Sequence, residues 1–308
     1  MEQPDSSTWD QAHDVPIMSW RSSDLPDHLP EHPVHLVKEP EEPGGLHLRS
    51  LYEPSDSTTL IVSLHGALPR GKFKLPRFEW RRTLNRVECA RLYLSDSTLE
   101  ISGSLEIGWY IGTAQQDLHS EYAAFVRSLA AAEGYQHILL VGSSAGGFGA
   151  LALSRQLADS LAVVFSPQTT ISGYQPGHRR ALAGASFPDH TTFDAIEADF
   201  ADRVNMRSLY SQSLDNNFVH YVQNTRDRFH FEAHYAAFAL SFGVNPEVGG
   251  SARGRRMSFH PERQEEGHAP PSRSQFIRHI EDAYRRYFDA DLSVLPPEAV
   301  QGANLGNR

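Results

Sequence analysis

Short apolar runs alternate with longer amphipathic segments along most of this 308-residue chain. An apolar run of about four to eight residues is typical of a strand buried on both faces, whereas apolar residues every three or four positions indicate a helix. The expected strands lie at 46–52, 59–64, 90–94, 138–141, 161–165, 218–222 and 257–259, and the expected helices at 117–133, 146–157, 231–242 and 273–288.

Alternating strands and helices indicate an α/β fold, with a mostly parallel central sheet flanked by helices. Between about 167 and 217 the pattern loosens, which predicts a cap or insert over the carboxyl edge of the sheet. Residues 1–45 are acidic and rich in proline, with little periodicity. We therefore expect an irregular N-terminal segment at 1–45, one domain at 46–290 and a loose C-terminal tail at 291–308.

Composition narrows the class of protein. The formal net charge of −10 argues against a nucleic-acid or anionic-membrane partner, because such partners need a cationic surface. The single cysteine, Cys89, excludes an intramolecular disulfide and a cysteine-based zinc site. The chain begins without a basic start and apolar stretch, and no apolar run approaches the ~18 residues of a membrane span. We expect a soluble, cytoplasmic protein; the oligomeric state stays open.

The most informative motif is Gly-x-Ser-x-Gly at 142–146, placed between an expected strand and an expected helix. This layout is typical of a nucleophile elbow, a strained strand-to-helix turn that exposes a serine. The two glycines leave room for backbone that would otherwise clash. Their spacing selects Ser144 rather than Ser143 as the candidate nucleophile.

A serine hydroxyl needs a base within hydrogen-bonding reach and an acid that orients the base. His268 follows the last expected strand and precedes the final helix, where a loop histidine can fold back over the sheet edge, so it is the candidate base. Asp227 comes a few residues after the strand at 218–222 and is the candidate acid. Asp215, just before that strand, is a weaker alternative.

The oxyanion of a tetrahedral intermediate needs two backbone donors. The amide of Ala145, which follows the nucleophile, is one expected donor. The second should come from the loop after an early central strand, and His65-Gly66-Ala67 lies there. We expect Gly66 or Ala67 to supply it.

Four more side chains are candidate substrate contacts. They are His65, Trp80, His230 and His234. Trp80 lies in an aromatic and basic segment that lines the pocket mouth or forms a solvated loop. The two last histidines are four residues apart, a spacing that also suits a metal, but no carboxylate or cysteine completes a recognisable zinc set, so we expect no metal.

Elbow, His-Gly loop and the order Ser144, Asp227, His268 together resemble the α/β-hydrolase superfamily of serine esterases and acyltransferases, over about residues 46–288. That resemblance implies an eight-stranded, mostly parallel sheet with one antiparallel early strand. The segments 108–112, 164–169 and 221–224 are similar to hydrolase-like proteins of bacterial polysaccharide and glycan-modification systems. The sequence departs from ordinary lipases in lacking a full His-Gly-Gly-Gly loop.

The expected function is a serine hydrolase that cleaves an acyl or acetyl ester of a small molecule or glycan through an acyl-enzyme, without a cofactor. Acyl transfer to a glycan hydroxyl by the same triad is an alternative, since it requires only that the site exclude water and bind an acceptor. A catalytically silent hydrolase-like accessory or binding protein is the alternative of a different class, because fold does not fix function.

Overall fold

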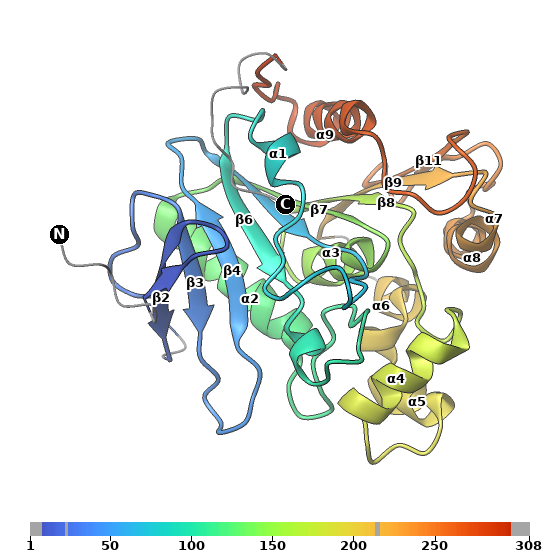
Figure 1. The fold of residues 1–308 in the computed structure, drawn as a ribbon. Helices are drawn as coiled ribbons and strands as arrows, with labels where there is room; N and C mark the ends of the chain where they lie inside the picture. The colour runs from blue at the N-terminus through green and yellow to red at the C-terminus, as the bar shows by residue number, and fades with distance from the viewer. Residues whose placement is uncertain (1–7, 22–23, 213–215, 297–308) are drawn as a thin grey trace.

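The computed structural model describes residues 8–21, 24–212 and 216–296. Within them, eleven strands form one sheet in the order β1-β2-β3-β4-β6-β5-β7-β8-β9-β11-β10 (Figure 1). The strands are β1 (Trp9–Asp10), β2 (Val15–Trp20), β3 (Val34–Lys38), β4 (Leu48–Glu53), β5 (Thr59–Leu64), β6 (Ala90–Ser95), β7 (His137–Ser143), β8 (Leu161–Phe165), β9 (Phe218–Asn224), β10 (Gly250–Ala252) and β11 (Met257–Glu262).

The centre of the sheet is parallel. Strands β6, β5, β7, β8, β9 and β11 pair in parallel with one another in that order, which confirms the predicted α/β class and mostly parallel sheet. The expectation of eight strands with a single antiparallel one is wrong, because β4 pairs antiparallel with both β3 and β6, and antiparallel pairs also close the two edges.

The prediction of an irregular segment at 1–45 is also wrong. Three short strands there extend the sheet, with β2 parallel to β3 and β3 antiparallel to β4. The prolines misled the prediction because most of them lie between strands or, like Pro33, just before one, where a missing N–H costs no ladder hydrogen bond. The strands are also too short to show a clear period.

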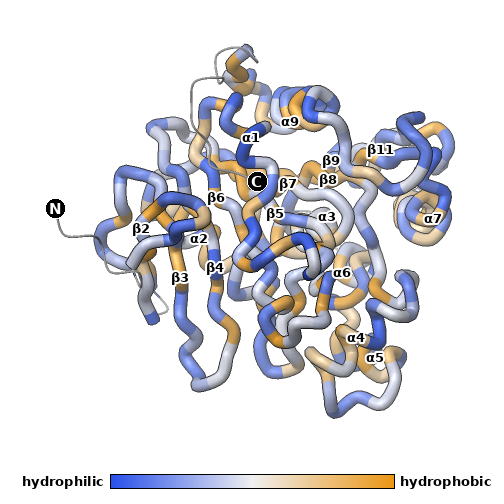
Figure 2. The backbone as a smooth tube through the Cα atoms, in the orientation of Figure 1, coloured by the Kyte–Doolittle hydropathy of each residue, from blue (hydrophilic) through white to orange (hydrophobic). Residues whose placement is uncertain are grey.

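Helices cover both faces of the sheet (Figure 1). α2 (Leu118–Glu133) and α3 (Ala145–Ser154) pack on one face, and α1 (Arg81–Leu84) and α9 (Arg273–Phe288) pack on the other. The sheet has a hydrophobic core on each face, and alternate residues of β5 belong to one or the other. Leu60 and Val62 face α2 and α3, while Ile61 faces α9. Figure 2 shows hydrophobic residues concentrated along central strands such as β7 and β8. Burial on both faces explains why these strands are apolar runs without alternation.

Caps set the ends of the two longest helices. The Asp117 side chain accepts hydrogen bonds from the first-turn amides of α2, and Gly134 ends that helix in the left-handed conformation with φ 74°. Ser272 and Gln275 form a reciprocal capping box at the start of α9. These signals account for the agreement between the predicted and observed bounds of both helices.

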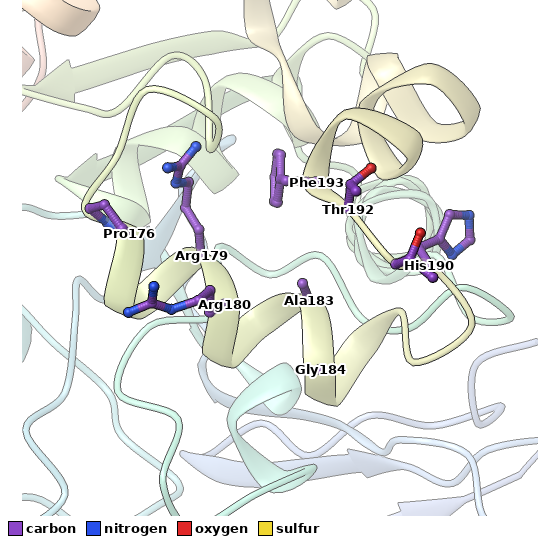
Figure 3. Close-up of a pocket in the computed structure, with 9 residues that line it drawn as sticks. Pro176, Arg179, Arg180, Ala183, Gly184, His190, Thr192 and Phe193 are labelled. Carbon is purple, nitrogen blue, oxygen red and sulfur yellow. The ribbon is translucent and has the colours of Figure 1, made fainter.

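The predicted cap at about 167–217 contains α4 (Pro176–Ser186), α5 (Phe193–Val204) and α6 (Met206–Ser211), and Asp215 falls outside the described residues. A cavity of about 410 Å³ lies between α4 and the start of α5, lined by residues that include Arg179, Ala183 and Phe193 (Figure 3). None of its lining residues is a predicted site residue, so this cavity belongs to the cap alone.

The helix predicted at 231–242 begins earlier and is not uniform. It consists of α7 (Arg228–His230), a π-type turn η2 (Phe231–Ala236) and α8 (Ala237–Ser241). In the predicted C-terminal tail, Val294 bridges to Val87 and Leu295 donates its amide to the Arg86 carbonyl, while 297–308 lie outside the described residues. Among the described helices, none has both the length and the apolar character needed to cross a membrane.

Candidate active site

Ser144 lies in a sharp turn between β7 and α3. Its backbone has φ 56° and ψ −122°, a strained conformation for a residue with a side chain. A Cβ on Gly142 would lie 2.4 Å from the Gly146 backbone, and a Cβ on Gly146 would lie 2.3 Å from the Leu64 carbonyl oxygen. Only glycine fits at either position, so the two glycines of the motif have the steric function that the sequence predicted for them.

Asp227 and His268 meet at the same edge of the sheet as Ser144. Asp227 follows β9 and His268 follows β11, and both strands run parallel to the strand that ends at the elbow. His268 Nδ1 lies 2.6 Å from Asp227 Oδ2. Asp227 is buried, whereas the His268 side chain is 33% exposed. Among the described residues, Ser144 Oγ has no hydrogen bond to His268.

Asn224, which sequence reasoning missed, connects the segments that carry Asp227 and His268. Its Nδ2 donates to the Glu265 and Gly267 carbonyls at 2.7 and 3.2 Å, and its Oδ1 accepts from the amides of Arg226 and Gln264. One side chain therefore bridges the turn that carries Asp227 and the loop that carries His268. An asparagine at the end of a buried strand was the signal that could have identified it.

Gln168 was not predicted either, and it is fully buried. Its Nε2 donates to Ser144 Oγ at 3.0 Å and to His230 Nε2 at 2.8 Å, and its Oε1 accepts from Trp109 Nε1 at 3.1 Å. Gln168 lies in the 164–169 segment, whose sequence resembles that of glycan-system proteins. A lone glutamine after a strand nevertheless gives no sign that it will bond to Ser144 and His230.

His230, expected as a substrate contact, lies buried under His268. Its Nδ1 is 3.0 Å from Asp227 Oδ1, and its ring stacks on that of His268 with centroids 3.8 Å apart and an angle of 11° between the planes. Asp227 thus accepts hydrogen bonds from two imidazoles: His230 Nδ1 lies 3.0 Å from both of its oxygens, and His268 Nδ1 lies 2.6 Å from Oδ2. The structure brings Ser144, Gln168, His230, Asp227 and His268 into one hydrogen-bonded network.

The His65-Gly66-Ala67 loop runs beside the elbow. A Cβ on Gly66 would come 3.8 Å from Ser144 Cβ. The Gly66 amide donates to Glu79 Oε2 at 3.3 Å, while the amides of Ala67 and Ala145 have no acceptor within the described chain. Of the predicted oxyanion-hole residues, Gly66 therefore lies close to Ser144, and Ala145 follows Ser144 directly in the chain.

His65 holds this loop from within the protein. Its Nε2 accepts from the Asp96 amide at 2.9 Å, which leaves Nδ1 to donate to the Gly66 carbonyl at 2.7 Å. Its backbone amide donates to the Tyr110 hydroxyl at 2.7 Å. Burial lowers the pKa of His65 to about 4, so it is a neutral anchor of the loop.

The two remaining candidates have no hydrogen bond to Ser144 among the described residues. His234 is fully buried and accepts a long 3.4 Å hydrogen bond from the Thr169 amide. Trp80 stacks on Phe276 with ring centroids 4.0 Å apart and lines a cavity of about 360 Å³ together with Glu79. Because Glu79 also binds Gly66, this cavity adjoins the loop beside the elbow.

Charge in the network is concentrated on Asp227. Burial works against its ionisation, but hydrogen bonds from His230 and His268 outweigh burial and hold the pKa of Asp227 well below its usual range. Burial lowers the pKa of His230, with Asp227 acting in the opposite direction. The arrangement is therefore an ionised carboxylate between two imidazoles, of which the buried one favours the neutral form.

A metal ion is the other occupant that this group of side chains suggests. Asp227, His230 and His268 each offer a ligand atom, and these atoms lie within 4.8 Å of one another. However, both imidazoles direct Nδ1 at an Asp227 oxygen at hydrogen-bonding distance, and their rings are stacked rather than convergent on one point. The donor set therefore fits an acid–base network better than a tetrahedral metal site.

Buried histidines predict a loss of stability at acid pH. Burial lowers the pKa of His65 to about 4 and that of His234 to about 3, and it also lowers the pKa of His220. An unfolded histidine takes up a proton near its ordinary pKa of 6.5, whereas these folded ones do not. Their stabilising effect is therefore complete above that pH and is lost as the pH falls toward the folded values.

Each of the three histidines should lower the free energy of unfolding by about 1 kcal/mol between about pH 6.5 and 5.5. Burial raises the pKa of Asp96 to about 6, which offsets part of this loss. Other buried histidines act in the same direction as these three, among them His260, whose pKa burial lowers to about 4. We expect a net fall in urea titrations, and His220→Gln should reduce it by roughly 1 kcal/mol. Equal stability at the two pH values would contradict the neutral burial of these side chains.

Comparison with known proteins gives structural relatives only. No family model and no curated protein matches the sequence. The capsule O-acetyltransferase of Neisseria meningitidis serogroup A has TM-score 0.55 and 19% identity, covering 80% of this chain and 91% of that chain. The S-formylglutathione hydrolase of Agrobacterium tumefaciens has TM-score 0.53 and 13% identity, covering 84% and 98%.

A third solved structure is the Glycosylation Associate Protein (Gap123) complex of Streptococcus agalactiae, with TM-score 0.56 and 11% identity over 79% of this chain and 45% of that chain. This chain therefore has an α/β-hydrolase-type fold, as the elbow and the order of the site residues suggested. Proteins named for capsule and glycosylation systems share that fold.

Proposed function

We propose that this protein is a serine enzyme that cleaves an acyl ester, with Ser144 as nucleophile, His268 as base and Asp227 as the acid that orients the base. The observation that carries the proposal is the meeting of three features at one sheet edge. These are a serine in a strained turn, two backbone amides beside it, and a short Asp227–His268 hydrogen bond of 2.6 Å. Together they match the requirements of acyl transfer through a covalent intermediate.

In the first step, Ser144 Oγ bonds to the ester carbonyl carbon while its proton passes to His268 Nε2. The amides of Ala145 and of Ala67 or Gly66 stabilise the oxyanion. When the intermediate collapses, the carbon–oxygen bond to the leaving alcohol breaks and His268 returns the proton to that alcohol. Water then attacks the acyl-serine with the same base, which releases the acid and restores the serine.

A glycan hydroxyl in place of water is the second candidate acceptor. The fold likeness to a capsule O-acetyltransferase, a variant of which has been solved in complex with CoA, favours it. Two aromatic rings also lie near the network, since Phe229 is 42% exposed and packs edge-on against Tyr174 with centroids 5.9 Å apart. Rings of this kind can pack against the apolar face of a sugar.

Labelling with a fluorophosphonate tests the proposal. We expect one adduct per chain by intact mass, mapped to Ser144 by peptide sequencing, with no adduct on Ser144→Ala. The reaction should run in EDTA, so that a metal-dependent route does not contribute. Failure of the native protein to label, while a known serine esterase labels in the same tube, would reject the proposal and leave the silent accessory protein as the better explanation.

The acceptor is decided separately, with acetyl esters and acetyl-CoA as donors in the presence and absence of oligosaccharides. Free acetate as the main product in both conditions supports hydrolysis. An acetylated oligosaccharide formed at the expense of acetate supports transfer.

A further inference from the structure

A chain of hydrogen bonds connects Ser144 to Asp227 without passing through His268. The indole N–H of Trp109 can only donate, and it donates to Gln168 Oε1 at 3.1 Å. That bond fixes which end of the Gln168 amide is nitrogen, and Nε2 then directs its two hydrogens at Ser144 Oγ and at His230 Nε2. The orientation of the Gln168 amide is therefore determined by the Trp109 indole N–H, which can act only as a donor.

The same logic fixes the proton on His230. Because Gln168 donates to Nε2, this nitrogen must accept, and the ring proton must lie on Nδ1, 3.0 Å from Asp227 Oδ1. A second proton on Nε2 would set one N–H against another. Gln168 thus opposes protonation of His230, in the same direction as burial.

A neutral His230 matters because its ring lies 3.8 Å from that of His268. When His268 takes the Ser144 proton, an imidazolium forms against the face of a neutral ring, which is a favourable contact. If His230 were also charged, two like charges would lie in van der Waals contact, and the base would be weakened. His230 Nδ1 lies 3.0 Å from both Asp227 oxygens, and Oδ2 also accepts the shorter 2.6 Å hydrogen bond from His268.

One strained loop, which carries Trp109 and Tyr110, contacts both Gln168 and the loop beside the elbow. Trp109 and Tyr110 are consecutive residues with positive φ, 51° and 59°. Asp96 Oδ2 accepts from the Tyr110 amide at 3.0 Å, and His119 Nε2 lies 2.9 Å from the Trp109 carbonyl. While Trp109 orients Gln168, the Tyr110 hydroxyl accepts from the His65 amide in the loop beside the elbow. Strain that is held by buried hydrogen bonds in this way is typical of functional sites.

We propose that Trp109, Gln168 and His230 are positioning residues that hold Ser144 and Asp227 in register and keep His230 a neutral partner of the catalytic base. This inference rests on the proposed function, because it assigns His268 as the base that Ser144 requires. Gln168 also occupies one lone pair of Ser144 Oγ. The hydroxyl proton is therefore the part of the group left free for the base.

The test is the second-order rate of fluorophosphonate labelling of Ser144 across about pH 5 to 9, with four variants. Trp109→Phe removes the indole N–H and keeps an aromatic ring, and we expect labelling about tenfold slower. Trp20→Phe is the matched control: the Trp20 indole nitrogen is also buried but has no partner among the described residues. Its labelling rate should equal that of the native protein.

His230→Phe keeps a stacking ring but removes a donor to Asp227. An Asp227 carboxylate with one donor fewer attracts the proton of the His268 imidazolium more strongly, so the acid limb of the rate profile should move up by about half a pH unit or more. His230→Asn places an amide donor near the Nδ1 position, and we expect it to return the limb toward that of the native protein. A purely structural role for His230 would lower the yield or melting temperature without moving the limb.

The outcomes separate the two proposals. If the native protein does not label, the proposed function fails. If it labels and both Trp109→Phe and His230→Phe keep its rate and its acid limb, the positioning role is wrong although the triad stands. Should His230→Phe fail to fold, Trp109→Phe and His230→Asn decide the question, with circular dichroism confirming that each is folded.

Discussion

Replacing Asp227 with asparagine is expected to lower kcat by about four orders of magnitude while leaving the fold intact, as loss of the acid does in triads of this type. The effect is large because Asp227 accepts hydrogen bonds from two imidazole N–H groups, that of His230 at 3.0 Å and that of His268 at 2.6 Å. An asparagine offers one acceptor and one donor, so at least one imidazole must change its tautomer or turn away.

The measurement is the rate of ester turnover together with fluorophosphonate labelling of Ser144. The matched control is Asp199→Asn, since Asp199 forms a 2.9 Å pair with His190 in the cap and belongs to no part of the network. That control should retain the native rate. An Asp227→Asn rate within about tenfold of native would show that Asp227 is not the orienting acid.

Replacing Gly146 with alanine is expected to destabilise the protein by more than about 3 kcal/mol, at the upper end for point substitutions. The new methyl group would lie 2.3 Å from the Leu64 carbonyl oxygen and 2.7 Å from that of His65. Both are backbone atoms at the end of the central strand β5, so relief of the clash would separate the elbow from the loop that carries the predicted oxyanion donors.

Gly184→Ala is the control for this substitution. Gly184 also lies in a helix, α4, but a Cβ there meets no atom within 4 Å. Alanine should therefore be neutral or stabilise by up to about 1 kcal/mol, because it favours the helix and restricts the unfolded chain. Urea titrations of the two variants give the comparison. Equal stabilities would show that the elbow can relax, contrary to the close approach seen here.

The central sheet could be predicted from the sequence because its strands are buried on both faces. The bounds expected for 59–64 and 161–165 match β5 and β8, since each apolar run ends where the chain leaves the sheet. Strands β1 to β3 were missed because they are short, lie near one edge and are interspersed with prolines. The π-type turn at 231–236 was missed because a local widening of a helix leaves its apolar spacing almost unchanged.

The sequence could suggest only those candidate site residues whose type the proposed chemistry requires, which are a serine, a histidine and an acid. Ser144 is marked by the glycines that its turn needs, and Asp227 and His268 by their places after two strands. Gln168 and Asn224 carry no such mark, because what they do depends on which buried donors and acceptors the fold places around them. His230 was singled out together with His234 as a substrate contact, and the hydrogen bond of its ring to Asp227 could not be foreseen from the sequence.

The hydrogen bonds of Asn224 set the relative position of Asp227 and His268, the proposed acid and base, directly across the loop after β11. Its amide binds carbonyls at 265 and 267 on one side and the amide of Arg226 on the other, so acid and base are fastened to a common point. A substitution elsewhere in the 263–271 connection that leaves these hydrogen bonds intact should therefore change what reaches the site while the distance between Asp227 and His268 is preserved.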